Sequence, residues 1–269
     1  MTTVEFASPV PEFVLGVHGV LRWHSWVVES HARGGFPQPD DEAVFSLTNS
    51  RAQALGLVAY PVPGRHNPMA RWSIGDSGGD WTQDGRVQKL AWMVARPLNL
   101  AHQGWPVWPG LACLHDGLAR VGAIDVAGVH AVLPLQLDTH PLGNFPDVYE
   151  WFQLTEKGAS GQEFGVSLYT ADERACDPEE LRQAINRHAG VLLDVRMDAQ
   201  PSTELADPDP LEGRWMFDGD LRGVHFRCRG PEWSLDMATF TTDVVAYAAT
   251  EIGVEQAVML TASRIDGEH

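Results

Sequence analysis

A short segment near the C-terminus alternates basic and apolar side chains. His225, Arg227 and Arg229 are separated from one another by Phe226 and Cys228. Because successive side chains of a β-strand point to opposite faces, the three basic groups would share one face. Imidazole exchanges protons near neutral pH, and guanidinium groups bind carboxylates and phosphates. The pattern predicts His225 as an acid–base group and Arg227 and Arg229 as anion-binding groups, unless the arginines pair with neighbouring acids on a solvated face.

Tryptophan side chains form a second group of candidate binding residues. The chain has 10 of them, and Trp105 and Trp108 flank prolines at the start of an apolar segment. Trp233 precedes a similar segment near the C-terminus. Aromatic side chains at such places line grooves that bind apolar or aromatic ligands. The alternative is that they fill the core between two halves of the protein.

Other histidines are alternative acid–base candidates, and the chain has 11 histidines in all. The alternatives are His18, His24, His102 and His130. No H-E-x-x-H pattern is present, and no Asp lies close to His18 or His24 in the sequence. Glycine-rich nucleotide-binding motifs are also absent from the sequence. We therefore predict no metal ligands and no cofactor.

The sequence Gly75-Asp76-Ser77-Gly78-Gly79 resembles the motif around the nucleophile of trypsin-like serine proteases. The chain before Ser77 is too short for the first barrel of that fold, and it lacks the Ala-Ala-His-Cys pattern of the catalytic base. Gly and Asp are frequent in turns because they tolerate positive φ and bond their own backbone. We expect a turn here and no nucleophile.

Composition restricts the class of protein. The 269 residues are 44% hydrophobic and 20% charged, which is typical of a globular protein. The net charge of -17 disfavours nucleic acids and anionic membranes as partners. The N-terminus lacks a secretory signal pattern, and no apolar run is long enough to span a membrane. We expect a soluble, cytoplasmic protein. The 3 cysteines form no metal or disulfide pattern and are expected to be buried thiols.

The stretch 108–137 and the stretch 233–265 both read as an amphipathic helix followed by a strand. At one constant offset, three apolar helix positions of the first stretch align with three of the second: Leu111, Leu114 and Leu118 with Met237, Phe240 and Val244. The same offset places Ala131 and Val132 on Ala257 and Val258. This similarity predicts an internal duplication, which is a strong indicator of architecture.

The remaining pattern gives the same order of elements in both halves. The expected strands are Phe13–Val28 (or a hairpin), 57–62, 71–74, 87–96, 129–137, 149–156 in a hairpin with 163–170, 191–197, 214–217 and 223–229. The expected helices are 40–55, one after Trp108, 177–190 with Asp177 as its N-cap, and one after Trp233.

The fold predicted from this order is α+β, with residues 1–140 and 147–269 as two repeats packed in one pseudo-twofold unit. Each repeat would contain a mixed or antiparallel sheet and two helices. The order of elements is similar to that of tandem ferredoxin-like folds, including dimeric α+β barrels, and to that of secretion-chaperone-like folds. The similarity concerns element order alone, so it transfers no site residues.

The functional hypothesis is a non-catalytic binding or accessory protein. A groove between the repeats would bind a protein or a small apolar or aromatic anionic ligand. The alternative is a cofactor-free cyclase, isomerase or lyase of a biosynthetic pathway, with a histidine as acid–base group and arginine binding an anion. The oligomeric state is left open.

Overall fold

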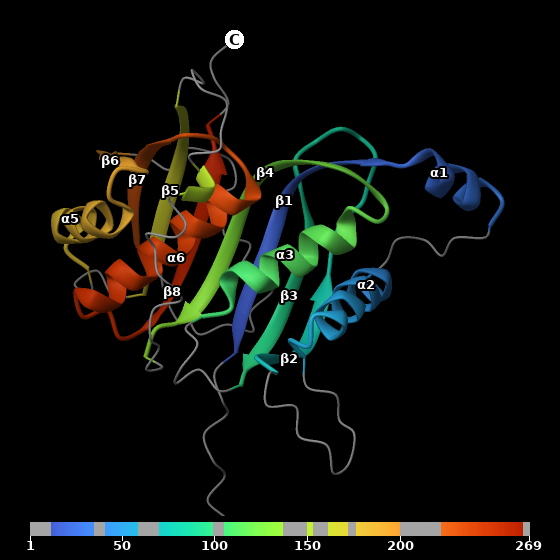
Figure 1. Ribbon diagram of the computed structural model, residues 1–269, viewed down its shortest axis with the longest axis horizontal. Coiled ribbons are helices and arrows are strands. Elements are labelled where there is room, and N and C mark those ends of the chain that lie inside the picture. Colours follow the sequence, from blue (N-terminus) through green and yellow to red (C-terminus); the bar gives the residue numbers. More distant parts are fainter. Residues whose placement is uncertain are drawn as a thin grey trace, which may run out of the picture.

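A computed structural model describes residues 12–34, 41–58, 70–98, 105–136, 150–152, 161–171, 176–199 and 222–265. Eight strands form one continuous sheet in the order β2-β3-β1-β4-β8-β5-β7-β6, and all neighbours are antiparallel (Figure 1). This confirms the α+β class. One sheet runs through both halves of the chain, because β4 pairs directly with β8.

The first half contributes strands β1 to β4. Their bounds are β1 Phe13–Trp23, β2 Trp72–Gly78, β3 Gln88–Pro97 and β4 Gly122–Pro134, and the helices are α1 Ser25–Ala32, α2 Asp41–Ala54 and α3 Val107–Leu118. The second half contributes strands β5 to β8. Their bounds are β5 Gln162–Thr170, β6 Asp194–Asp198, β7 Arg222–Gly230 and β8 Ala257–Arg264, and the helices are α5 Pro178–Ala189 and α6 Leu235–Glu251. From the centre outward the strands run β4-β1-β3-β2 on one side and β8-β5-β7-β6 on the other.

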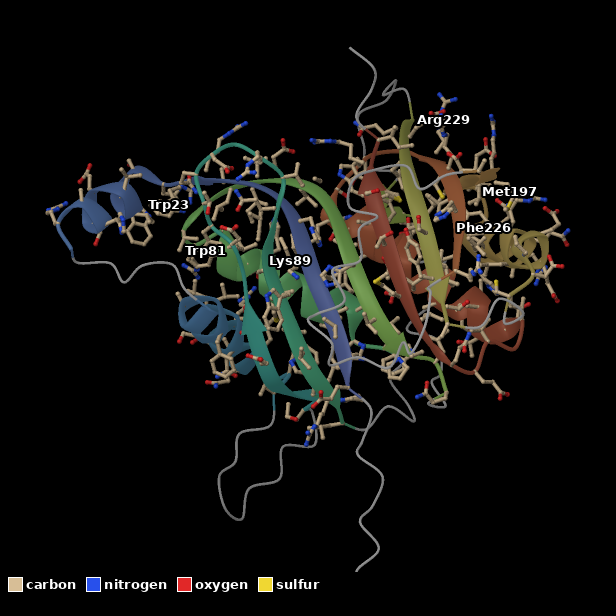
Figure 2. The ribbon with its side chains drawn as sticks, turned by 180° about the vertical axis from the view of Figure 1, so that it is seen from behind. Trp23, Trp81, Lys89, Met197, Phe226 and Arg229 are labelled. Atoms are coloured by element: carbon tan, nitrogen blue, oxygen red, sulfur yellow. The ribbon has the colours of Figure 1, made fainter. Side chains whose placement is uncertain are left out.

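Four helices cover one face of the sheet, in the order α2-α3-α6-α5 (Figure 1). Helix α3 packs on β1 and β3, while α6 packs on β4 and β8 across the middle of the sheet. Helix α1 projects from the side of the first half. We call the opposite face of the sheet, seen in Figure 2, the back face. No described helix covers it.

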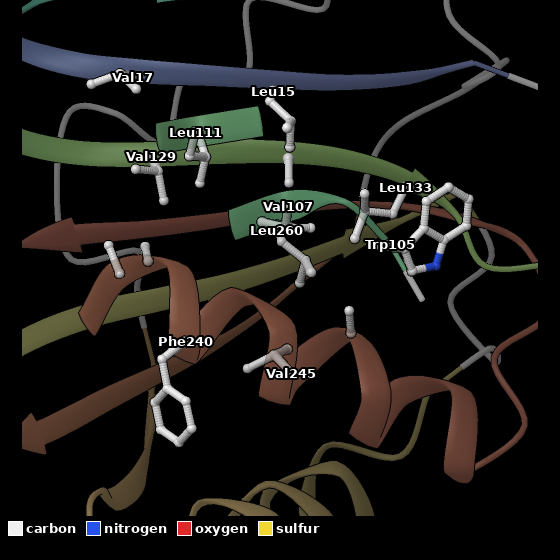
Figure 3. Close-up of a cluster of buried hydrophobic side chains, with 14 of the residues drawn as sticks. Leu15, Val17, Trp105, Val107, Leu111, Val129, Leu133, Phe240, Val245 and Leu260 are labelled. Carbon is white, nitrogen blue, oxygen red and sulfur yellow. The ribbon is translucent and has the colours of Figure 1, made fainter. Parts of the chain in front are cut away.

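The main core lies between the sheet and these helices. Leu15, Leu111, Val129 and Leu260 are at most 1% exposed and converge on the middle of this layer with Val245 (Figure 3). Burial of such side chains stabilises the fold by about 1.5–3 kcal/mol each. The core is continuous across the β4–β8 junction, so the two halves fold around shared apolar contacts. Within the described residues, no helix has the length and apolar character needed to cross a membrane.

Helix ends follow the sequence signals closely. Asp177 caps α5 by accepting hydrogen bonds from the backbone N–H groups of Glu179 and Glu180, at 2.8 and 3.0 Å. Gly190 follows this helix with φ of 57°, and Gly56 follows α2 with φ of 70°. Glycine adopts this left-handed conformation without steric cost, which explains both helix ends. The predicted α2 and α5 are confirmed.

Two strand predictions are wrong. The segment expected to be a strand or hairpin through Val28 leaves the sheet at Trp23 and continues as α1. The hairpin expected between 149–156 and 163–170 does not form, because β5 already has β7 and β8 on its two edges. Residues 150–152 are helical, and buried Phe152 packs on Phe240 of α6 with ring centroids 5.8 Å apart. In the predicted strand 57–62, Val58 forms only an isolated bridge with Trp72, and residues 59–62 lie outside the described residues. The predicted strand 214–217 also lies outside them.

The Gly-Asp-Ser-Gly segment is also not a turn. Residues Gly75 to Gly78 continue β2, with an irregular register between Ile74 and Asp76. Ser77 is 2% exposed, and its hydroxyl has no hydrogen-bond partner among the described residues. Gly79 lies against the backbone of Leu90, so that a side chain does not fit there. Gly79 therefore serves close strand packing, a tertiary requirement that the local turn composition does not reveal.

The constant offset between the two helix–strand stretches aligns buried positions in the helices but opposite faces in the strands. Leu111 and Met237, which it aligns, are both fully buried in the core. It also aligns Val132 with Val258, yet Val258 faces the helices whereas Val132 lies in a separate apolar cluster on the back face. One additional residue reverses the face of every side chain in a strand. Strand positions that face the same side are therefore not aligned by the offset that aligns the buried helix positions.

Candidate functional site on the back face

A row of polar side chains crosses the back face at one level of the sheet. The strand registers place the following residues directly beside one another, from β3 to β6: Trp92, Gly16, His130, Thr261, Ser167, His225 and Asp198. We call this set the polar row. His130 and Thr261 form its centre, at the junction of the two halves. Cross-strand neighbours lie close enough for their side chains to interact, so the row can act as one hydrogen-bonding surface.

His225 and Ser167 form the hydrogen-bonded part of the row in the second half. His225 Nδ1 lies 2.8 Å from Ser167 Oγ. The His225 ring leans over Gly223, where an added Cβ would lie 2.7 Å from Nε2. Burial lowers the pKa of His225, while the nearby Asp198 carboxylate opposes the shift. The imidazole is therefore neutral at pH 7, and it has both a hydrogen-bond donor and an acceptor.

Arg227 follows His225 on the same face. Its Nε lies 3.3 Å from Asp198 Oδ2, and its Nη1 lies 3.7 Å from Glu163 Oε2. Arg229 is exposed on the same side, where Figure 2 labels it, and its strand neighbours are Glu163 and Asp194. The predicted strand and its alternation are confirmed: Phe226 and Cys228 face the core. Arg227 also has the acidic partners that the alternative hypothesis requires.

Tyr169 adds a buried phenol beside this pair. It is 7% exposed, and its ring centroid lies 5.6 Å from that of His225 in an edge-on arrangement. Burial raises the pKa of Tyr169, and Ser167 acts in the opposite direction. The phenol hydroxyl nevertheless meets hydrogen-bond geometry with no described residue, Ser167 included. Tyr169 is thus a protonated donor without an acceptor, an uncommon state for a buried polar group.

A histidine pair lies in the first half, with His18 on β1 and His130 on β4. His18 Nε2 lies 2.8 Å from His130 Nδ1, and the ring of His130 lies against Gly16. Burial, with a contribution from Lys89, lowers the pKa of His18 to about 4. Burial likewise keeps the pKa of His130 well below its usual range. Both rings are neutral at pH 7, and each satisfies part of the other's hydrogen-bonding capacity.

An apolar row lies next to the polar row on the same face. It consists of Val94, Val14, Val132, Met259 and Tyr169, which neighbour one another across β3, β1, β4, β8 and β5. All five are at most 7% exposed. Tyr169 therefore links the two rows, since its ring belongs to the apolar row and lies beside His225 of the polar row. A ligand with an apolar body and a polar head would match this arrangement.

The tryptophans do not lie with His225. Trp105 packs edge-on against Phe13 with ring centroids 6.3 Å apart, on the helix side of the sheet. Trp233 packs on Phe164 at 5.2 Å and donates its indole N–H to the Val126 carbonyl at 2.8 Å. Trp108 is 55% exposed on α3. The structure therefore separates these three residues from the back face, because the sheet lies between them.

The other candidate histidines are also apart from the polar row. His24 precedes α1, and its Nε2 lies 3.2 Å from the Ala119 carbonyl oxygen. His102 lies outside the described residues. Among the described residues, His, Cys, Asp and Glu side chains form no group of three that could hold a metal ion.

Sequence reasoning missed Ser167, Tyr169, Thr261 and Asp198. A usable signal existed in β5, where the segment Phe164–Leu168 alternates apolar residues with Gly165 and Ser167. That alternation indicates a strand with one smaller and more polar face. It did not indicate that this face would meet His225, because strand order is decided by tertiary pairing.

No protein-family model matches the chain, and neither the curated proteins nor the solved structures include a match.

Proposed function

We propose that the protein binds a small organic ligand on the back face of the sheet, with an aromatic or apolar body and an anionic oxygen-bearing head. The observation that carries this proposal is the polar row beside the apolar row on one face. The first offers hydroxyl and imidazole groups, and the second offers aliphatic surface. Ligand sites typically combine a mainly apolar lining with a few polar groups that fix orientation.

A small ligand fits this site better than a protein partner. Ser167 is 4% exposed, and Thr261 and Tyr169 are each 7% exposed. Side chains so enclosed do not form a broad surface, whereas a small molecule becomes enclosed between them. Lys89 lies beside His18 in the first half, and Arg227 lies beside Asp198 in the second. These cations favour an anionic head in a protein that is otherwise strongly acidic.

We also infer an internal duplication with a pseudo-twofold axis. The matching strand orders β4-β1-β3-β2 and β8-β5-β7-β6 support it, and so does the similar order of helices. This order agrees with a tandem ferredoxin-like arrangement. The axis would pass near His130 and Thr261, where β4 and β8 pair. The proposed ligand site would then lie where the two repeats join.

A cofactor-free enzyme is the second candidate, favoured by the pair formed by His225 and Ser167. A neutral imidazole that is hydrogen-bonded to a hydroxyl can accept a proton from a substrate. Arg227, two residues along the strand, would stabilise the negative charge that results. In this case His225 is the acid–base group, and a bound ligand is converted rather than merely held.

Thermal-shift and calorimetric titrations with benzoate and phenylacetate test the binding proposal, with inorganic phosphate as a small anion lacking an apolar body. We expect both aromatic acids to raise the melting temperature and phosphate to have little effect. Arg227→Gln should weaken the binding of benzoate, whereas Arg33→Gln, which removes an exposed arginine of α1, should not. If neither acid binds, or if both substitutions act equally, the proposal is wrong. Mass spectrometry of the recovered acids, with His225→Asn as comparison, separates binding from conversion.

A further inference from the structure

We propose that the Tyr169 hydroxyl donates the hydrogen bond that fixes a carboxylate oxygen of the ligand. This inference rests on the proposed function and makes it specific, because it selects one donor and one acceptor class. It also assigns a role to a residue that neither the basic segment nor the tryptophans suggested.

The unpaired hydroxyl is the first observation. Tyr169 is more than nine-tenths buried, yet its hydroxyl makes no hydrogen bond of acceptable geometry with any residue that the structure describes. Tyr and Trp side chains in protein interiors usually have a partner for their polar atom. A buried hydroxyl without one destabilises the free protein, since the group has lost its water and received nothing in return. A ligand oxygen at this position would remove that deficit.

The two halves differ in whether their polar groups on the back face are paired within the protein. In the first half, His18 and His130 are hydrogen-bonded to one another, so the polar groups there are paired within the protein. In the second half, Ser167 and His225 are likewise paired, but Tyr169 is left over. The unpaired donor therefore lies on one side of the junction, which points to the second half as the place of the ligand's polar head.

A second donor lies beside the phenol. If His225 donates from Nδ1, the Ser167 hydroxyl is free to donate to a ligand. If Ser167 donates to Nδ1, the proton of the neutral ring is on Nε2 instead. That nitrogen and the Tyr169 ring both lie close to Gly223, at 2.7 and 2.9 Å from the position of an added Cβ. Either tautomer supplies a donor near the phenol, and two donors match the two oxygens of a carboxylate.

Tyr169 also lies beside the apolar side chains that would contact the body of the ligand. Tyr169 lies opposite Met259 on β8, and Met259 lies opposite Val132 on β4. An aromatic ring attached to the carboxylate would extend over these side chains. Arg227 lies on the neighbouring strand, where Asp198 and Glu163 already hold its guanidinium in place. Its remaining N–H groups can donate to the ligand. The class of ligand is therefore an aromatic or alicyclic carboxylic acid.

The substitution Tyr169→Phe tests this role, because it removes the hydroxyl and keeps the ring. We expect the dissociation constant for benzoate to rise about 10- to 100-fold, the usual effect of leaving a buried acceptor without its donor. The melting temperature of the ligand-free variant should stay equal or increase, since an unsatisfied hydroxyl has been removed. Tyr247→Phe is the matched control, because Tyr247 lies on α6 beside His188 and away from the back face. It should leave benzoate affinity unchanged.

These measurements distinguish failure of the Tyr169 assignment from failure of the proposed function. If the unaltered protein binds no aromatic acid, the proposed function and this inference fail together. If it binds benzoate and Tyr169→Phe binds equally well, only the assignment of Tyr169 is overturned. A fall in the melting temperature of free Tyr169→Phe, absent from Tyr247→Phe, would also overturn it, because the hydroxyl would then have a structural partner.

Discussion

His18 Nε2 and His130 Nδ1 lie 2.8 Å apart on adjacent central strands, and the ring of His130 lies against the backbone of Gly16. The two imidazoles share one hydrogen bond, so one nitrogen donates and the other accepts. A proton added to the accepting nitrogen would break the contact and place a charge near Lys89. The pair is therefore stable only while both rings are neutral.

Stability should consequently decrease in mild acid. The pKa of His18 is about 4 in the folded protein, against 6.5 for an ordinary histidine. The unfolded chain binds the additional proton between these values, so the free energy of unfolding is highest above pH 6.5 and falls as the pH approaches 4. We expect His18 to contribute a loss of about 2 kcal/mol between pH 7 and pH 5. Urea unfolding at several pH values measures this loss in the free energy of unfolding.

His18→Gln is the matched variant for this measurement, because glutamine hydrogen-bonds but does not titrate. The difference between the unaltered protein and the variant isolates the histidine from other groups that titrate in the same range. Equal pH dependence of the two proteins would contradict the assignment.

Asp243 of α6 should give the opposite dependence of stability on pH, with stability decreasing as the pH rises. Burial raises the pKa of its carboxyl from 3.8 to about 8, and the positive charge of Arg71 offsets only part of this. A carboxyl with a raised pKa destabilises the fold increasingly as the pH rises from 4 to 8. Water screens part of the effect because the side chain keeps some exposure. We expect Asp243→Asn to raise the free energy of unfolding at pH 8 by about 2 kcal/mol, with little change at pH 4. A destabilised variant at pH 8 would refute this.

Gly16→Ala should disrupt the histidine pair by steric means. An added Cβ would lie 2.6 Å from His130 Nδ1 and closer still to Cε1, so the ring must move. Overpacking of this kind destabilises a protein by about 1–3 kcal/mol. Gly75→Ala is the control, because a Cβ there meets nothing closer than 3.7 Å. Chemical denaturation should show a loss of stability for the first variant alone. A loss no larger for Gly16→Ala than for Gly75→Ala would contradict the predicted clash.

Asp177→Ala should weaken α5 through its first turn. The carboxylate accepts two backbone N–H groups that would otherwise lack partners. Loss of such a cap destabilises by about 1 kcal/mol. Thermal unfolding measures the change, with exposed Val191→Ala, at 91% exposure, as the reference for a neutral substitution. A loss no larger than that of the reference would mean that the cap contributes nothing measurable.

Local signals in the sequence predicted much of the secondary structure. Asp177 and Gly190 indicated both ends of α5, because capping depends on residues within one turn of the helix end. The alternation around Phe226 gave β7 and placed His225 and Arg227 on one face, since strand periodicity is a local property. The hairpin before β5 was mispredicted because two adjacent apolar segments do not specify which strands pair.

By itself, the sequence determined the α+β class, the alternation of basic and apolar side chains in β7 and most helix boundaries. These follow from composition, periodicity and capping, which act over a few residues. The tertiary structure alone decided that β5 lies between β7 and β8, and thus that Ser167 and Tyr169 meet His225. It also placed Trp105 and Trp233 on the far side of the sheet. Such pairings depend on long-range burial and register, for which a single strand carries no local signal.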